Sequence, residues 1–145
     1  MIATVLLRLG VLFALCGMAL GIAMGIRQDF TLAPAHAHIN LVGFVGLFLA
    51  GLYYRLVPEA AASALAKVQA SIAIAAAVIF PLGIGGVLLS GRDSFELITV
   101  IGALLVFAGM ALFAVIVFRT SGSTRAASSV RSAPAGSAAM SREGR

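Results

Sequence analysis

Charged residues are scarce in this sequence. Asp, Glu, Lys and Arg together make up 10% of the 145 residues, whereas soluble domains contain about 25%. Hydrophobic residues make up 61%, and the mean hydropathy is +1.11. This composition argues against a soluble globular domain and indicates a chain that lies in a lipid bilayer.

Reactive side chains are also few. Tryptophan is absent, and the single cysteine, Cys16, excludes an intrachain disulfide. Cys16 lies inside an apolar run, where we expect it to act as a small buried or lipid-facing hydrophobe. The apolar runs contain no paired carboxylates, no Ser/His/Asp set and no phosphate-binding loop. The sequence therefore gives no indication of hydrolysis or group transfer, and it predicts no catalytic residue.

Four long apolar runs predict four membrane-spanning helices, because a span needs about 20 mostly apolar residues. We expect an all-α integral membrane four-helix bundle over residues 1–119. Residues 120–145 are rich in Ser, Ala, Gly and Arg and are predicted to form a disordered basic tail. The first run is longer than the core of a secretion signal, so we expect it to be retained. The predicted helices are residues 2–26, 35–56, 64–89 and 95–118.

The basic residues predict the orientation in the membrane. The formal net charge is +5, and five of the ten Lys and Arg residues lie at or beyond Arg119. Clustering of this kind indicates an orientation signal and weak attraction to anionic lipid, not nucleic-acid binding. We therefore expect a multi-pass protein of the inner (cytoplasmic) membrane, with both termini in the cytoplasm and the loops near residues 30 and 92 outside.

Glycines recur along the first predicted helix. Gly10, Gly17, Gly21 and Gly25 are spaced by seven, four and four residues. Small residues at this spacing allow two membrane helices to approach closely. We therefore expect this stripe to be a contact between helices.

The stretch from Pro34 to Pro58 contains both histidines of the chain, His36 and His38. At about 100° per residue, these two side chains leave the helix on different sides. His36 falls on a stripe of small and polar residues, and His38 falls beside large apolar ones. A pair at this spacing suits two ligands on opposite sides of one helix. The stripe with His36 contains Asn40, Gly43, Ala50, Gly51 and Tyr54.

The H-A-H sequence with the glycines, tyrosines and proline that follow it resembles the histidine-bearing helix of the haem–copper oxidase subunit I superfamily. The likeness covers about 25 of the 145 residues and is strongest to the cbb3-type oxidases and nitric oxide reductases. The resemblance implies that His36 and His38 are axial ligands of b-type haem. The copper site of that family needs further histidines, which this chain lacks. A complete oxygen-reducing site within one copy is therefore excluded.

Five further residues are candidates for binding the cofactor. Asn40 lies one turn from His36 and is placed to bond a propionate, a ligand or a neighbouring helix, and Gly43 is placed to let a flat macrocycle approach the helix. Arg27 and Arg92, in the two external loops, are candidate propionate partners, although interfacial arginines also extend toward lipid headgroups. Met24 is a candidate second axial ligand, with simple packing as the alternative.

We therefore expect an integral membrane haem protein that transfers electrons or binds a diatomic gas. Whether it is an enzyme stays open. One alternative is a copper- or zinc-binding or transport module that uses the same histidines, and another is a membrane assembly protein without a cofactor. Subunit I of the resembled family has three arcs of four helices, so the resemblance implies a homo-oligomer, a trimer by analogy. A respiratory or redox partner is also implied.

Overall fold

The computed structural model describes residues 1–131, with side chains as far as Thr120. Every element within these residues is a helix, and four helical segments are long and apolar enough to cross a membrane. The predicted all-α, four-span membrane fold is thus confirmed. The elements are α1 (Ile2–Arg27), α2 (Ala33–His38), η1 (Ile39–Gly46), α3 (Leu47–Leu56), α4 (Pro58–Ala62), α5 (Ala64–Ser90) and α6 (Asp93–Arg131).

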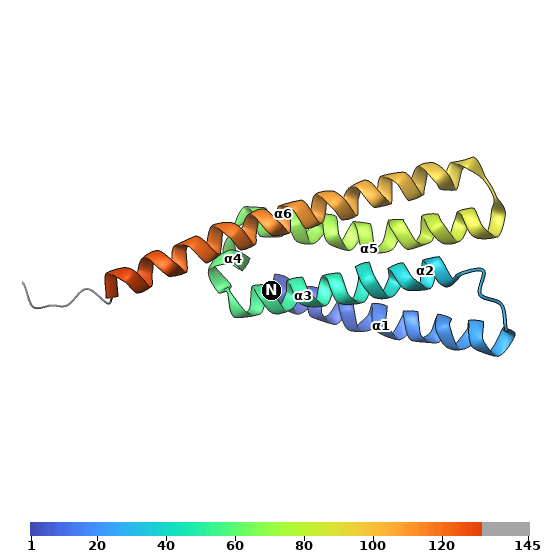
Figure 1. Ribbon diagram of the computed structural model, residues 1–145, viewed down its shortest axis with the longest axis horizontal. Helices are drawn as coiled ribbons and strands as arrows, with labels where there is room; N and C mark the ends of the chain where they lie inside the picture. The colour runs from blue at the N-terminus through green and yellow to red at the C-terminus, as the bar shows by residue number, and fades with distance from the viewer. Residues whose placement is uncertain (132–145) are drawn as a thin grey trace, which may run out of the picture.

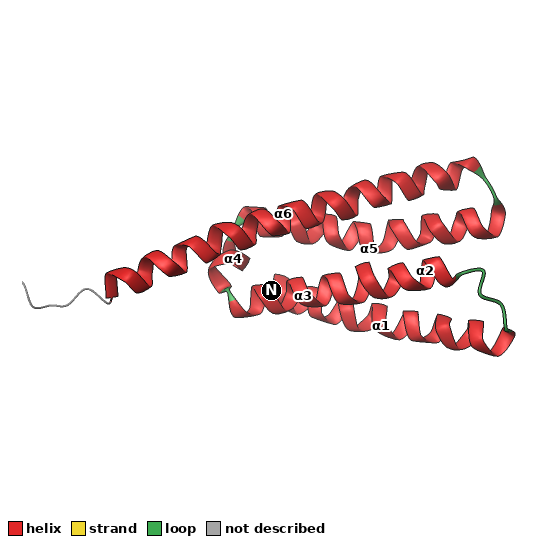
Figure 2. Cartoon of the chain, in the orientation of Figure 1, coloured by secondary structure: helices red, strands yellow, loops and turns green. Residues whose placement is uncertain are grey.

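The helices form two hairpins (Figure 1). In the first hairpin, α1 packs against the second span, which is the continuous run of α2, η1 and α3. In the second hairpin, α5 packs along α6. The two hairpins meet mainly where α2 and η1 contact α5. The short green loops in Figure 2 show how little of the chain lies between spans.

The spans lie in a row in the order α1, second span, α5 and α6 (Figure 1). The contacts between helices agree with this order: α1 packs mainly on the second span, and α6 packs mainly on α5. The N-terminus and the end from which α6 projects lie at the same end of the molecule (Figure 1). The loops after α1 and α5 lie together at the other end.

Large apolar side chains cover the outer faces of the row. Leu12, Ile22, Leu104 and Phe107 are among the exposed ones, and Phe107 is 76% exposed. Water would oppose this exposure, whereas lipid tails solvate such side chains. The exposed surface therefore supports a multi-pass membrane protein.

The fourth helix differs from its predicted bounds. It was expected to end at residue 118, but α6 continues to Arg131. The residues beyond Phe118 contain no proline before Pro134, and alanine and arginine are good helix formers. The prediction of a disordered tail from residue 120 is therefore wrong as far as Arg131. The rest of that tail, residues 132–145, lies outside the described residues.

The first loop is closed by hydrogen bonds of its own. Gln28 adopts the left-handed conformation (φ 52°) and ends α1, and its amide Nε2 donates to the carbonyl of Gly25 at 2.6 Å. The Asp29 carboxylate then accepts from the hydroxyl of Thr31 at 2.7 Å and from its backbone N–H at 3.0 Å. Both bonds favour the ionised carboxylate, so they lower the pKa of Asp29 below its usual 3.8.

We expect this loop to loosen in acid. Because the folded pKa of Asp29 is depressed, its stabilising effect is present above about pH 3.8 and is lost as the pH falls through the folded value. An NMR titration of the Asp29 carboxyl carbon should give a midpoint below 3.8. In Thr31→Val the hydroxyl donor is gone, so the midpoint should rise. An unchanged midpoint in that variant would show that the hydroxyl bond does not set the pKa.

Candidate cofactor site

The ring of His36 projects from the second span toward α1. Its Nδ1 is 2.9 Å from the backbone carbonyl oxygen of Gly17 on α1. A carbonyl oxygen can only accept, so Nδ1 carries the proton and donates it. In the neutral ring, Nε2 then has a free lone pair. Nε2 lies 3.5 Å from the amide Nδ2 of Asn40, at the outer limit of a hydrogen bond.

His38 leaves the helix on the other side, as the helical spacing predicts. Its Nδ1 is 2.7 Å from the carbonyl oxygen of Pro34, so this nitrogen also donates to a backbone carbonyl. The ring packs edge-on against Phe80 of α5, with 4.7 Å between ring centroids. The Nε2 of His38 has no hydrogen-bond partner among the side chains described up to Thr120.

Both imidazoles are therefore fixed in the same tautomer. Each donates its Nδ1 proton to a backbone carbonyl and keeps the Nε2 lone pair. This is the usual arrangement of histidines that bind a metal, because the backbone bond fixes the ring and leaves the other nitrogen for the metal. The two lone pairs belong to rings that face different helices, α1 for His36 and α5 for His38.

The glycines of α1 make room for the polar side chains of this site. A Cβ at Gly17 would lie 2.5 Å from both terminal atoms of the Asn40 amide, and one at Gly21 would lie 2.9 Å from Cε1 of His36. The predicted glycine stripe is thus a contact between helices at these positions. Gly25, at its end, has no neighbour within 4 Å, so the expected contact does not extend there.

The other predicted residues are only partly brought together. Asn40 stays with His36 and donates to its carbonyl oxygen at 3.0 Å. Gly43 is covered by the ring of Phe13, so no macrocycle reaches it in this arrangement. Met24 is buried (7% exposed) near the end of α1. Arg27 and Arg92 are exposed; Arg27 is the last residue of α1, and Arg92 lies in the loop between α5 and α6.

Comparisons with known proteins leave the family open. No protein-family model matches this chain, and no curated protein or solved structure matches it.

Two features of the structure are absent from the sequence prediction. The first is the π-helix η1, which begins directly after His38. Wide turns of this kind are rare and are frequent at functional sites. The second is Gln69, which is 3% exposed and accepts a hydrogen bond from the hydroxyl of Tyr54 at 2.9 Å. Its one signal in the sequence is that it is the sole amide side chain of the third apolar run.

Proposed function

We propose that this chain is an integral membrane protein that binds b-type haem through His38 and His36, for electron transfer or for binding a diatomic gas. The observation that carries the proposal is the shared tautomer of the two rings. Each has its Nδ1 proton on a backbone carbonyl. The Nε2 lone pair of His38 is available, whereas that of His36 faces the Asn40 amide at 3.5 Å. Neutral imidazole in this state is the usual axial ligand of haem iron.

The donor set favours a porphyrin over a bare metal ion. A structural zinc site needs four protein ligands and a catalytic one needs three. The described residues form no group of three or more His, Cys, Asp and Glu side chains that could hold a metal ion. A porphyrin supplies four nitrogen ligands itself, so one or two imidazoles are sufficient. Copper or zinc binding stays the second candidate and is one outcome of the test below.

The two histidines fit the proposal to different degrees. The ring of His38 is half-buried, and its Nε2 is free of hydrogen bonds within the described residues. His36 is also half-buried, but its ring packs against α1 and the Asn40 amide lies beside its Nε2. We therefore assign His38 as the ligand that is directly available. His36 would bind iron only after the Asn40 side chain turns away.

The bound haem would supply the redox or gas-binding chemistry, and the chain would hold and orient it. The carbonyl oxygens of Pro34 and Gly17 fix the planes of the two rings. Arg27 and Arg92 would bond the propionates, because Arg27 ends α1 just before the first loop and Arg92 lies in the loop between α5 and α6. Met24 would be a second axial ligand or a packing residue, and the burial of its side chain suits packing more directly.

A second copy would complete the coordination. His36 and His38 face different helices, so one copy does not present both nitrogens to the two sides of one iron. The large apolar side chains exposed on the outer faces of the helices leave room for contact with further copies in the membrane. By analogy with the resembled family we propose a homotrimer, which native mass measurement in mild detergent would detect. A respiratory or redox partner remains part of the proposal.

The proposed location is the inner (cytoplasmic) membrane with both termini in the cytoplasm. Arg119 and the four basic residues beyond it support this orientation, because positively charged segments stay on the cytoplasmic side. The histidine end would then lie toward the outer surface.

The test is a cofactor assay on the full chain, purified in detergent from haem-replete cells. We expect a pyridine haemochrome spectrum typical of b-type haem and an iron content that matches it. Copper or zinc without haem would support the second candidate. Neither haem nor metal would favour a cofactor-free assembly protein and would overturn the proposal.

A further inference from the structure

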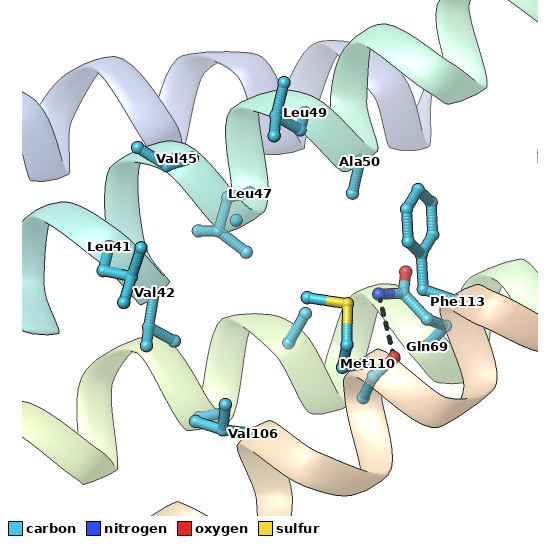
Figure 3. Close-up of a pocket in the computed structure, with 14 residues that line it drawn as sticks. Leu41, Val42, Val45, Leu47, Leu49, Ala50, Gln69, Val106, Met110 and Phe113 are labelled. Carbon is cyan, nitrogen blue, oxygen red and sulfur yellow. Dashed lines mark hydrogen bonds between the residues drawn. The ribbon is translucent and has the colours of Figure 1, made fainter.

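A cavity of about 410 Å³ lies between the two hairpins, away from the histidines. It is open on one side, and its walls come from η1, α3, α5 and α6 (Figure 3). The volume lies within the range of about 300–1,000 Å³ that is usual for small-molecule sites. The lining is almost wholly apolar, with Leu47, Ala73 and Met110 among its residues.

Gln69 is the polar side chain in this lining. Gln69 is buried, with a relative exposure of 3%. Its Oε1 accepts from the Tyr54 hydroxyl at 2.9 Å, and its Nε2 donates to the carbonyl oxygen of Gly109 at 3.4 Å. In Figure 3 the amide nitrogen lies on the side of the Gln69 side chain that faces the open space.

A primary amide nitrogen has two N–H donors. The bond to Gly109 uses one of them, and the second has no acceptor among the side chains and backbone described up to residue 120. A buried donor without an acceptor is costly, and in the hydrocarbon region no bulk water is at hand to satisfy it. The cavity therefore combines an apolar wall with one unused hydrogen-bond donor.

We propose that this cavity binds a lipophilic ligand that carries a carbonyl oxygen, and that the oxygen accepts the second N–H of Gln69. The quinones of a membrane belong to this chemical class. The ring of Phe113 and the thioether of Met110 flank the amide and provide the apolar contact for a flat ring. A lipid acyl chain fits the wall less well, because it has no acceptor for the N–H. This site is separate from the proposed haem ligands, which do not line the cavity.

The test compares two probes that differ in their carbonyl groups. The full chain in lipid nanodiscs is titrated with 2,3-dimethyl-1,4-naphthoquinone and, separately, with 2,3-dimethylnaphthalene, with empty nanodiscs as the baseline. The second methyl group prevents addition of the exposed Cys16 thiol to the quinone ring. We expect the quinone to bind about tenfold more tightly than the hydrocarbon, as one hydrogen bond predicts.

Three variants test the residues. Tyr54→Phe keeps both Gln69 donors and should leave quinone binding unchanged. The double variant Tyr54→Phe, Gln69→Leu removes the donors without leaving the tyrosine hydroxyl unpaired, and it should bind the quinone about tenfold more weakly. Ala73→Phe fills the cavity and should abolish binding of both probes.

Equal binding of the two probes would overturn the proposal and would indicate an apolar space that lipid chains fill. Absence of quinone binding to the wild-type chain would overturn it too. The probe comparison needs no variant, so it remains decisive if a Gln69 variant fails to fold. His38→Ala should retain quinone binding, which separates this site from the proposed haem site.

Discussion

Replacement of His38 by alanine is expected to lower the haem-to-protein ratio of the purified chain by about tenfold or more. Loss of a residue that merely supports a metal ligand commonly costs 10- to 100-fold in affinity, so loss of the ligand itself should cost at least about as much. The ratio is measured by the haemochrome assay against total protein. The prediction rests on the free Nε2 of a ring that the Pro34 carbonyl and Phe80 hold in place.

Two further variants show whether the effect of His38→Ala comes from loss of an iron ligand or from loss of packing. Phe80→Leu removes the edge-on ring contact but keeps the imidazole and its bond to Pro34, so most of the haem should remain. His36→Ala tests whether the second histidine is also a ligand, and we expect a smaller loss than in His38→Ala. Wild-type haem content in His38→Ala, with intact membrane insertion, would remove His38 from the site.

Gly17→Val is expected to destabilise the chain by about 1–3 kcal/mol, the usual cost of overpacking a close contact. A Cβ at Gly17 would lie 2.5 Å from the amide atoms of Asn40. Asn40 and His36 would have to move, and the bond from His36 to the Gly17 carbonyl would weaken. The free energy of unfolding in mixed detergent micelles, followed by circular dichroism, measures the effect.

Gly25→Val is the matched control on the same helix. No atom lies within 4 Å of a Cβ at Gly25, while the change in helix propensity is the same as at Gly17. We therefore expect the control to lose far less stability. Equal losses in the two variants would mean that the Gly17 contact with the second span does not hold the first hairpin together.

The number and type of the helices follow from the sequence because apolar runs of about 20 residues have few other solutions in a membrane. The opposite directions of His36 and His38 also follow, since side chains two residues apart on a helix point in directions that differ by a large angle. Gly17 and Gly21 mark a helix contact as predicted. Their partners are the side chains of Asn40 and His36, which spacing within one helix does not identify.

The rest depends on contacts that one-dimensional spacing does not contain. The π-helix η1 winds more widely than the 100° per residue assumed for the second span. The predicted stripe nevertheless faces α1 as far as Gly51, where a Cβ would lie 2.9 Å from Leu7. Gly43 faces Phe13 of α1, whereas Tyr54 bonds Gln69 of α5. The cover over Gly43 arises from packing within the first hairpin, and the cavity beside Gln69 arises from packing between the two hairpins, so both appear first in the structure.

The most direct measurement is the absorption spectrum of the detergent-purified chain, oxidised and then reduced with dithionite. Binding of iron porphyrin by His38 predicts a Soret band that shifts to longer wavelength on reduction and is much weaker in His38→Ala. A colourless preparation from haem-replete cells, or the same spectrum in wild type and His38→Ala, would contradict it.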